Sequence, residues 1–76
     1  MNKLPVLSFA EVIKILSKIG FYIHHQKGSH IIMKRNNPYC RLVVPAHRTI
    51  KKGLLNAIIK QAELTKEDFF RLMEEL

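Results

Sequence analysis

The sequence predicts one α+β domain with the element order α-β-β-β-α-α and an antiparallel three-stranded sheet. Apolar residues recur at helical spacing near both ends of the chain, and the period changes to two between Phe21 and Val44. The connections between the central segments are short, which is typical of an antiparallel meander. With 76 residues the chain has room for one thin core, so we expect residues 1–76 to form a single domain.

A capping box predicts the start of the first helix. The Ser8 side chain can accept a hydrogen bond from the backbone N–H of Glu11, whose own side chain can reach back to Ser8. Apolar residues follow at helical spacing, and Gly20 provides a C-terminal stop. We therefore expect a helix from Phe9 to Ile19.

Three strands are expected in the middle of the chain, at Phe21 to Gln26, Ser29 to Arg35 and Tyr39 to Val44. Lys27-Gly28 forms a plausible tight turn between the first two, and Asn36-Asn37-Pro38 separates the second from the third.

Alternation assigns the side chains of the strands to two faces. In the second strand Ile31 and Met33 share one face, and His30, Ile32 and Lys34 share the other. In the first strand strict alternation predicts opposite faces for the neighbours His24 and His25; the two sets there are Phe21, Ile23 and His25 against Tyr22, His24 and Gln26.

Two further helices are expected after the strands. A second apolar stripe at helical spacing predicts one helix, and Thr65 opens a short third helix with Glu67 and Asp68 in its first turn. We expect the first two helices to cover one sheet face and residues 65–76 to pack on the core. The two stripes are Leu54, Leu55, Ile58, Ile59 and Ala62, and then Phe69, Leu72, Met73 and Leu76.

The distribution of charge favours a polyanionic partner. Thirteen basic residues face six acidic ones, and no acidic residue occurs between Glu11 and Glu63. That window contains ten of the basic residues and all four histidines. Because a solvated surface normally mixes both signs, the asymmetry favours nucleic acid, or an acidic protein that masks the same surface, over a generic basic surface.

The residue types predict neither a metal site nor a cofactor. Zinc needs three or four suitably spaced ligands, whereas Cys40 is the only cysteine, His24 and His25 are adjacent, and His30 and His47 stand alone. Residues 12–62 contain no carboxylate for magnesium, so nuclease chemistry here would have to proceed without metal. We expect no secretory signal or spanning helix in residues 1–10, and a single cysteine suits the reducing cytosol.

The sequence also argues against an enzyme with a cysteine or serine nucleophile. Cys40 lies mid-strand among apolar neighbours, which favours a core or edge position, and Ser29 beside His30 lacks an acidic third member. The segment from Gln26 to His30 remains. It combines a basic residue, a glycine, a hydroxyl and an imidazole, which can hold a phosphate and move a proton beside it. A polar strand residue is the alternative interpretation of His30.

An ordered set of motifs resembles the HicA toxins, the YcfA-like family. The set comprises Gly28-Ser29-His30, Val44-Pro45-Ala46-His47, and Ile50 to Leu55 with the later Lys60-Gln61-Ala62. The resemblance implies a fold like the double-stranded RNA-binding domain and the toxin half of a type II toxin–antitoxin pair. It further implies a cytoplasmic, ribosome-independent mRNA interferase that is neutralised by a HicB-like antitoxin.

The resemblance places the family's catalytic histidine at His30, with Gly28 and Ser29 shaping the turn that presents it. His47 is either structural, antitoxin-contacting or a second proton carrier. We expect attack by the ribose 2′-hydroxyl, while the alternatives are a non-catalytic double-stranded-RNA-binding module and an inactivated toxin that still binds its antitoxin. The residues expected to contact RNA or phosphate are Lys27, Gly28, Ser29, Lys34, Arg41, Lys51 and Lys52.

Overall fold

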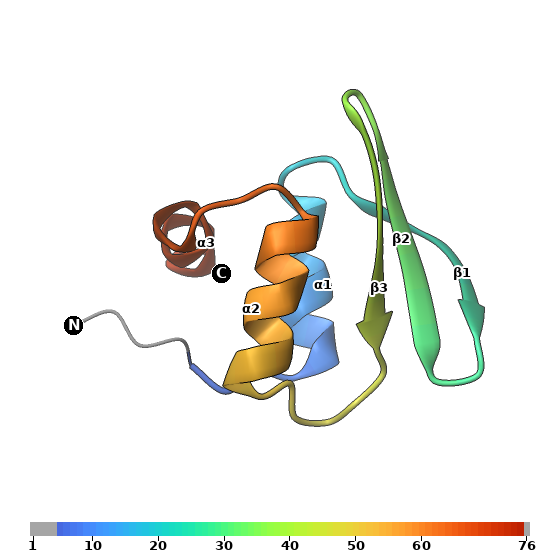
Figure 1. Cartoon of the computed structure of the whole chain (residues 1–76), viewed down its shortest axis with the longest axis horizontal. Coiled ribbons are helices and arrows are strands. Elements are labelled where there is room, and N and C mark those ends of the chain that lie inside the picture. Colours follow the sequence, from blue (N-terminus) through green and yellow to red (C-terminus); the bar gives the residue numbers. More distant parts are fainter. Residues whose placement is uncertain (1–4, 76) are drawn as a thin grey trace.

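Six elements follow one another in the predicted order in the computed structural model, which describes residues 5–75 (Figure 1). Their bounds are α1 Phe9–Ser17, β1 Tyr22–Lys27, β2 His30–Asn36, β3 Tyr39–Pro45, α2 Lys52–Gln61 and α3 Lys66–Met73. The predicted α+β class and the antiparallel three-stranded sheet are confirmed.

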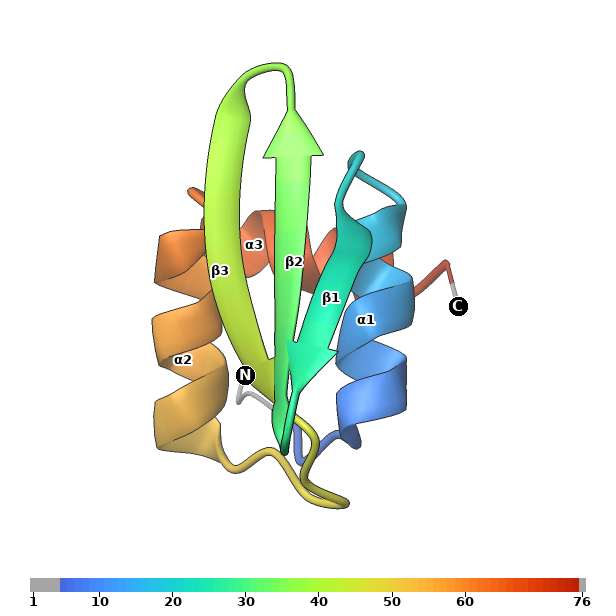
Figure 2. The same ribbon diagram turned by 90° about the vertical axis from the view of Figure 1, so that its right-hand side faces the viewer.

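The sheet has the strand order β1-β2-β3. Helices α1 and α2 lie side by side behind it, and α3 packs against both helices on the side away from the strands (Figures 1 and 2). Within residues 5–75 nothing covers the opposite sheet face, which we call the open face. The expectation that the first two helices cover one face of the sheet is therefore confirmed.

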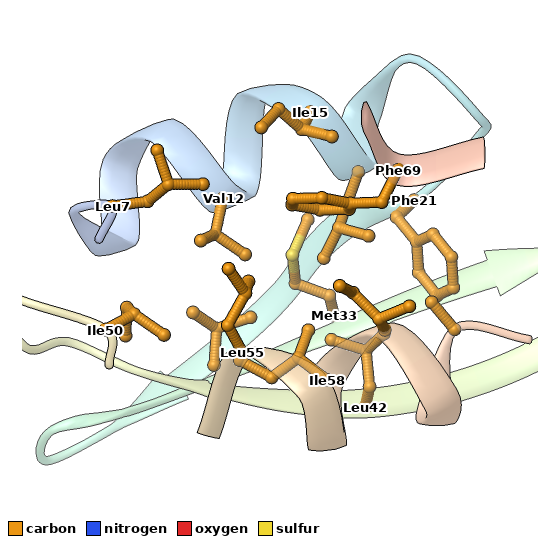
Figure 3. Close-up of a cluster of buried hydrophobic side chains, with 14 of the residues drawn as sticks. Leu7, Val12, Ile15, Phe21, Met33, Leu42, Ile50, Leu55, Ile58 and Phe69 are labelled. Atoms are coloured by element: carbon orange, nitrogen blue, oxygen red, sulfur yellow. The ribbon is translucent and has the colours of Figure 1, made fainter. Parts of the chain in front are cut away.

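A single apolar cluster fills the space between sheet and helices (Figure 3). Ile31 and Met33 of β2 point into it, as alternation predicts, together with Leu42 and Val44 of β3. Ile32 is also buried but lies outside this cluster, because it belongs to the open face. The helices contribute Val12, Ile15 and Leu16 from α1, Leu55, Ile58 and Ile59 from α2, and Phe69 from α3.

Helix α1 begins as predicted but ends two residues early. The Ser8 backbone N–H donates to Glu11 Oε1 at 2.9 Å, and Ser8 Oγ accepts from the Glu11 backbone N–H at 3.2 Å. Beyond Ser17 the backbone tightens into bonds between residues three apart, such as Ile19 N–H to Leu16 O at 3.1 Å. Gly20 then takes a φ of +96°, a conformation that glycine adopts without steric cost.

Arg35 is one of the basic residues between Glu11 and Glu63, and its contacts stabilise the fold. Its Nη2 lies 3.0 Å from Glu63 Oε1, its Nε donates to the Pro38 carbonyl at 2.9 Å, and its guanidinium lies over the Phe21 ring. Glu63 itself has a left-handed φ of 63° just beyond α2. The ion pair thus helps hold a backbone conformation that costs a non-glycine residue about 1–2 kcal/mol.

Helix α3 is tied into the core, as predicted. Thr65 caps it through Oγ1, which accepts from the Asp68 backbone N–H at 3.0 Å. Phe69 is fully buried, whereas Leu72 and Met73 are partly buried against the cluster. Leu76, which was expected in the same apolar face, lies outside the described residues.

No helix within residues 5–75 combines the length and apolar character that crossing a bilayer requires.

Replacement of Phe69 tests whether α3 stabilises the domain. Loss of a fully buried phenylalanine ring typically costs about 3–5 kcal/mol, a large part of the 5–15 kcal/mol that is usual for whole domains. We expect Phe69→Ala to lower the free energy of unfolding by that amount in urea titration. Arg71→Ala, an exposed change on the same helix, should cost about 0.5 kcal/mol or less. Equal effects of the two substitutions would contradict a structural role for α3.

Candidate functional site

The turn between β1 and β2 presents the Gly28-Ser29-His30 motif. Lys27 and His30 are the paired residues that close a two-residue loop. Gly28 has a φ of +60°, as the first loop residue of a type II′ turn requires. A Cβ at this position would meet no atom within 4 Å, so the glycine is needed for its backbone conformation rather than for space.

The loop after β3 is fastened beside this turn. The Ala46 backbone N–H donates to Ser29 O at 2.7 Å, and Pro45 pairs with His30 across the sheet. His47 O accepts from the Phe9 N–H at 3.2 Å, which ties the loop to the start of α1. The loop leads into α2, so the backbones of His47, Lys51 and Lys52 lie at the same end of the molecule as the turn (Figure 2).

The open face is built from rows of paired residues, because partners on neighbouring antiparallel strands share a face. Lys34 and Arg41 are partners two rows above His30, about 13 Å away at about 3.3 Å per residue. These two cations therefore share a face with His30 but do not crowd it. From the turn upward the rows are Lys27 with His30 and Pro45, then His25 with Ile32 and Val43, then Tyr22 with Lys34 and Arg41.

The prediction that His24 and His25 occupy opposite faces is wrong. The register of β1 shifts between Ile23 and His25, which makes a β-bulge at His24. Because a bulge inserts one extra residue, strict alternation fails beyond it. The Nδ1 atoms of the two imidazoles lie 2.7 Å apart, so one ring donates and the other accepts. The same shift turns Gln26 away from the predicted face and pairs it with the inward Ile31.

His24, at the bulge, also has a pKa that is affected by the cations Lys34 and Arg41. Lys34 is the main cause that lowers the pKa of His24 from its ordinary value of 6.5, with smaller contributions from desolvation, His25 and Arg41. The unfolded chain therefore binds this proton more readily than the folded one. By linkage, the shift opposes folding as the pH falls below about 6.5, and its effect vanishes well above that value.

Cys40 belongs to the interior, as predicted. It is buried in the apolar cluster, and its Sγ donates to the Gln61 carbonyl at 3.0 Å. It packs α2 onto β3 and lies on the inward face of the sheet, opposite His30.

His30 lies on an exposed surface rather than in a pocket. Two hollows of about 430 and 270 Å³ lie along α1 and α3, lined by residues such as Lys14 and Phe70, and His30 borders neither. An open site accommodates a polymer more readily than a small molecule, which usually occupies an enclosed cleft. Among residues 5–75 no three His, Cys, Asp or Glu side chains are grouped so that they could hold a metal ion.

A family model described as "HicA toxin of bacterial toxin-antitoxin" matches residues 9–64. The chain belongs to the HicA toxin family. It is accordingly a toxin component of a bacterial toxin–antitoxin system, with an antitoxin as its partner. A search of curated proteins found no match.

Two of the HicA motifs meet at one end of the sheet, whereas Lys60-Gln61-Ala62 lies at the other end of α2, where the Gln61 carbonyl contacts Cys40. Gly28-Ser29-His30 forms the turn and the start of β2, and the later motifs supply the fastened loop and α2. Residues 65–75, with α3, lie outside the matched region. Sequence reasoning missed the contact between His24 and His25, because neither composition nor residue spacing predicts a β-bulge.

The dependence of His24 on Lys34 can be measured directly. We expect Lys34→Gln to raise the pKa of His24 toward 6.5, because the substitution removes the largest cause of its lowering. An NMR titration of the imidazole resonances reads this out. Lys60→Gln removes an equal charge from exposed α2 and should leave the pKa of His24 unchanged. An unaltered His24 titration in Lys34→Gln would refute the assigned electrostatic contact.

Proposed function

We propose that this HicA toxin is a metal-independent endoribonuclease that cleaves mRNA with His30. The observation that carries the proposal is the position of His30: an exposed imidazole that opens β2 beside a tight turn, with Lys27 as its cross-strand partner. The three strands contain no acidic residue, so a phosphate can approach this face without repulsion.

The chemistry uses the substrate's own nucleophile. A base removes the proton from the ribose 2′-hydroxyl, O2′ attacks phosphorus, and the P–O5′ bond breaks while the 5′-oxygen gains a proton. The products are a 2′,3′-cyclic phosphate and a 5′-hydroxyl end. His30 acts as the general acid or base in this scheme, since imidazole exchanges protons near neutral pH. His47, on the neighbouring loop, is the candidate second proton carrier.

Basic side chains hold the phosphates. Lys27 lies beside His30, where its ammonium group can stabilise charge that develops on the phosphorane. The Gly28-Ser29 turn lets the backbone approach closely. Lys51 and Lys52 at the start of α2 add positive charge at the same end, and Lys34 and Arg41 extend it across the face.

The antitoxin partner is proposed to be HicB-like and to present an acidic surface. A net charge of +7 attracts such a surface and speeds association, which salt then slows. An antitoxin bound over the His30 end of the sheet would prevent RNA from reaching the basic side chains that hold its phosphates. Both the mRNA substrate and this partner place the proposed activity in the cytoplasm.

Replacement of His30 tests the catalytic assignment. General acid–base groups contribute about 10²–10⁴-fold to rate, so His30→Ala should reduce RNA cleavage by at least that lower factor and abolish growth arrest. Cleavage is followed on labelled mRNA, and cooperative thermal unfolding checks that the variant is folded.

Lys60→Ala provides the control, because Lys60 is also exposed but lies on α2. It should cleave at the parent rate. Persistent toxicity of His30→Ala would remove His30 from the mechanism, and a mobility shift without fragments from the parent protein would favour the non-catalytic RNA-binding module.

The products and the response to a chelator test the metal-free mechanism. We expect undiminished cleavage in EDTA and fragments that end in 2′,3′-cyclic phosphate and 5′-hydroxyl, because the attacking oxygen comes from ribose. Mass spectrometry of the fragments distinguishes these ends from 3′-hydroxyl and 5′-phosphate. Activity that is lost in EDTA and restored by magnesium would refute the mechanism.

A further inference from the structure

The open face carries two features that lie at a distance from His30. The first is the pair Lys34 and Arg41, which lie directly opposite each other on β2 and β3. Like charges in this arrangement destabilise a sheet. Neither side chain forms an ion pair with any residue from 5 to 75. The pair therefore fits an anion that the folded chain itself does not supply.

The second feature is a pair of exposed tyrosines at the β2–β3 hairpin end of the same face. Tyr22 is the cross-strand partner of Lys34, and Tyr39 is the partner of Asn36 in the next row. Their exposed fractions are 41% and 64%, high for aromatic side chains. The Tyr22 hydroxyl donates to Asn36 Oδ1 at 3.0 Å, which holds the ring over the space between the two rows.

We propose that the open face is a binding track for a single RNA strand, in which Lys34 and Arg41 hold a phosphate and Tyr22 and Tyr39 stack on bases. This deepens the proposed ribonuclease function and rests on it, because the track leads along β2 to His30. Cations that follow the backbone, combined with aromatic rings that stack on bases, are the combination by which proteins bind single strands without sequence preference.

The dimensions of the face suit this substrate. His30 and Asn36 are the ends of the seven-residue strand β2, so they are separated by about 20 Å at about 3.3 Å per residue step. A strand of about six nucleotides covers that length at the ~3.4 Å spacing of stacked bases. Lys34 is the main cause that lowers the pKa of His24 on the edge strand β1, and the same positive charge would attract an RNA backbone.

Single-stranded RNA explains the tyrosines better than a duplex does. A-form duplexes are recognised mainly through backbone and 2′-hydroxyl contacts, which need no exposed rings for base stacking. An acidic antitoxin segment would satisfy Lys34 and Arg41, but it has no bases to stack on Tyr22 and Tyr39.

Binding is tested with cleavage switched off. In a His30→Ala background, the affinity for a fluorescein-labelled ten-nucleotide RNA is measured by anisotropy. Adding Tyr39→Ala should weaken binding about 5- to 150-fold, the range for loss of one stacked base, and Tyr39→Phe should retain it. Lys34→Gln should make the plot of log affinity against log salt concentration less steep, reducing the magnitude of its slope by about 0.7.

Two controls match these variants. Leu54→Ala removes exposed apolar area from α2, and Lys60→Gln removes one exposed charge there; neither should alter RNA affinity. A 16-base-pair RNA duplex should compete poorly with the single strand. The track is refuted if Tyr39→Ala binds the strand as tightly as its parent, or if the duplex competes equally well.

The outcome for the track is separable from that for the ribonuclease. If the otherwise unaltered protein cleaves RNA but Tyr39→Ala leaves affinity unchanged, the track is wrong and the enzyme stands. If the protein binds the strand through Tyr39 but never cuts RNA, the proposed enzyme is wrong. Loss of antitoxin binding in Lys34→Gln, with RNA binding intact, would assign the cations to the antitoxin and overturn their part in the track.

Discussion

Burial of only one face of the sheet constrains the rest of this structure. A short chain encloses little volume, and the inward residues of β2 and β3 meet residues of three helices in a single apolar cluster. Both large covering helices pack on that side, so the side chains of the other face are exposed or half-buried, apart from the buried Ile32. The surface proposed to bind RNA is therefore the one that the core leaves uncovered, and it can carry charge without weakening the interior.

Local signals made most of the fold predictable. The capping box at Ser8 and the N-terminal residue Thr65 marked helix starts, because both signals involve only residues within the first turn. Alternation in β2 correctly placed Ile31 and Met33 on one face, opposite His30, since nothing interrupts the register of that strand with β3. The turn that presents His30 was predictable to within one residue, because Gly28 permits the positive φ that such a loop requires. The prediction put the turn at Lys27-Gly28, whereas Lys27 pairs with His30 and the loop residues are Gly28 and Ser29.

Features that depend on contacts distant in sequence were not predictable. The bulge at His24 arises from how β1 pairs with β2, and no local pattern distinguishes it from a regular strand. The structural role of Arg35 depends on Glu63, which is 28 positions away. The count of charges grouped Arg35 with the other basic residues between Glu11 and Glu63. The folded chain shows that Arg35 forms an ion pair with Glu63, whereas its neighbour Lys34 lies on the open face.

The bulge in β1 has a consequence for self-association. β1 is an edge strand and its residues are all exposed. The backbone N–H and C=O groups of its outer edge could therefore pair with a strand of another molecule. Flat, regular edges promote aggregation by strand addition, whereas bulges and charged side chains discourage it. The extra residue at His24 breaks the regular edge, and Lys27 places a charge near its end. The irregularity that joins two imidazoles thus also protects the solubility of a chain whose sheet is bare on one side.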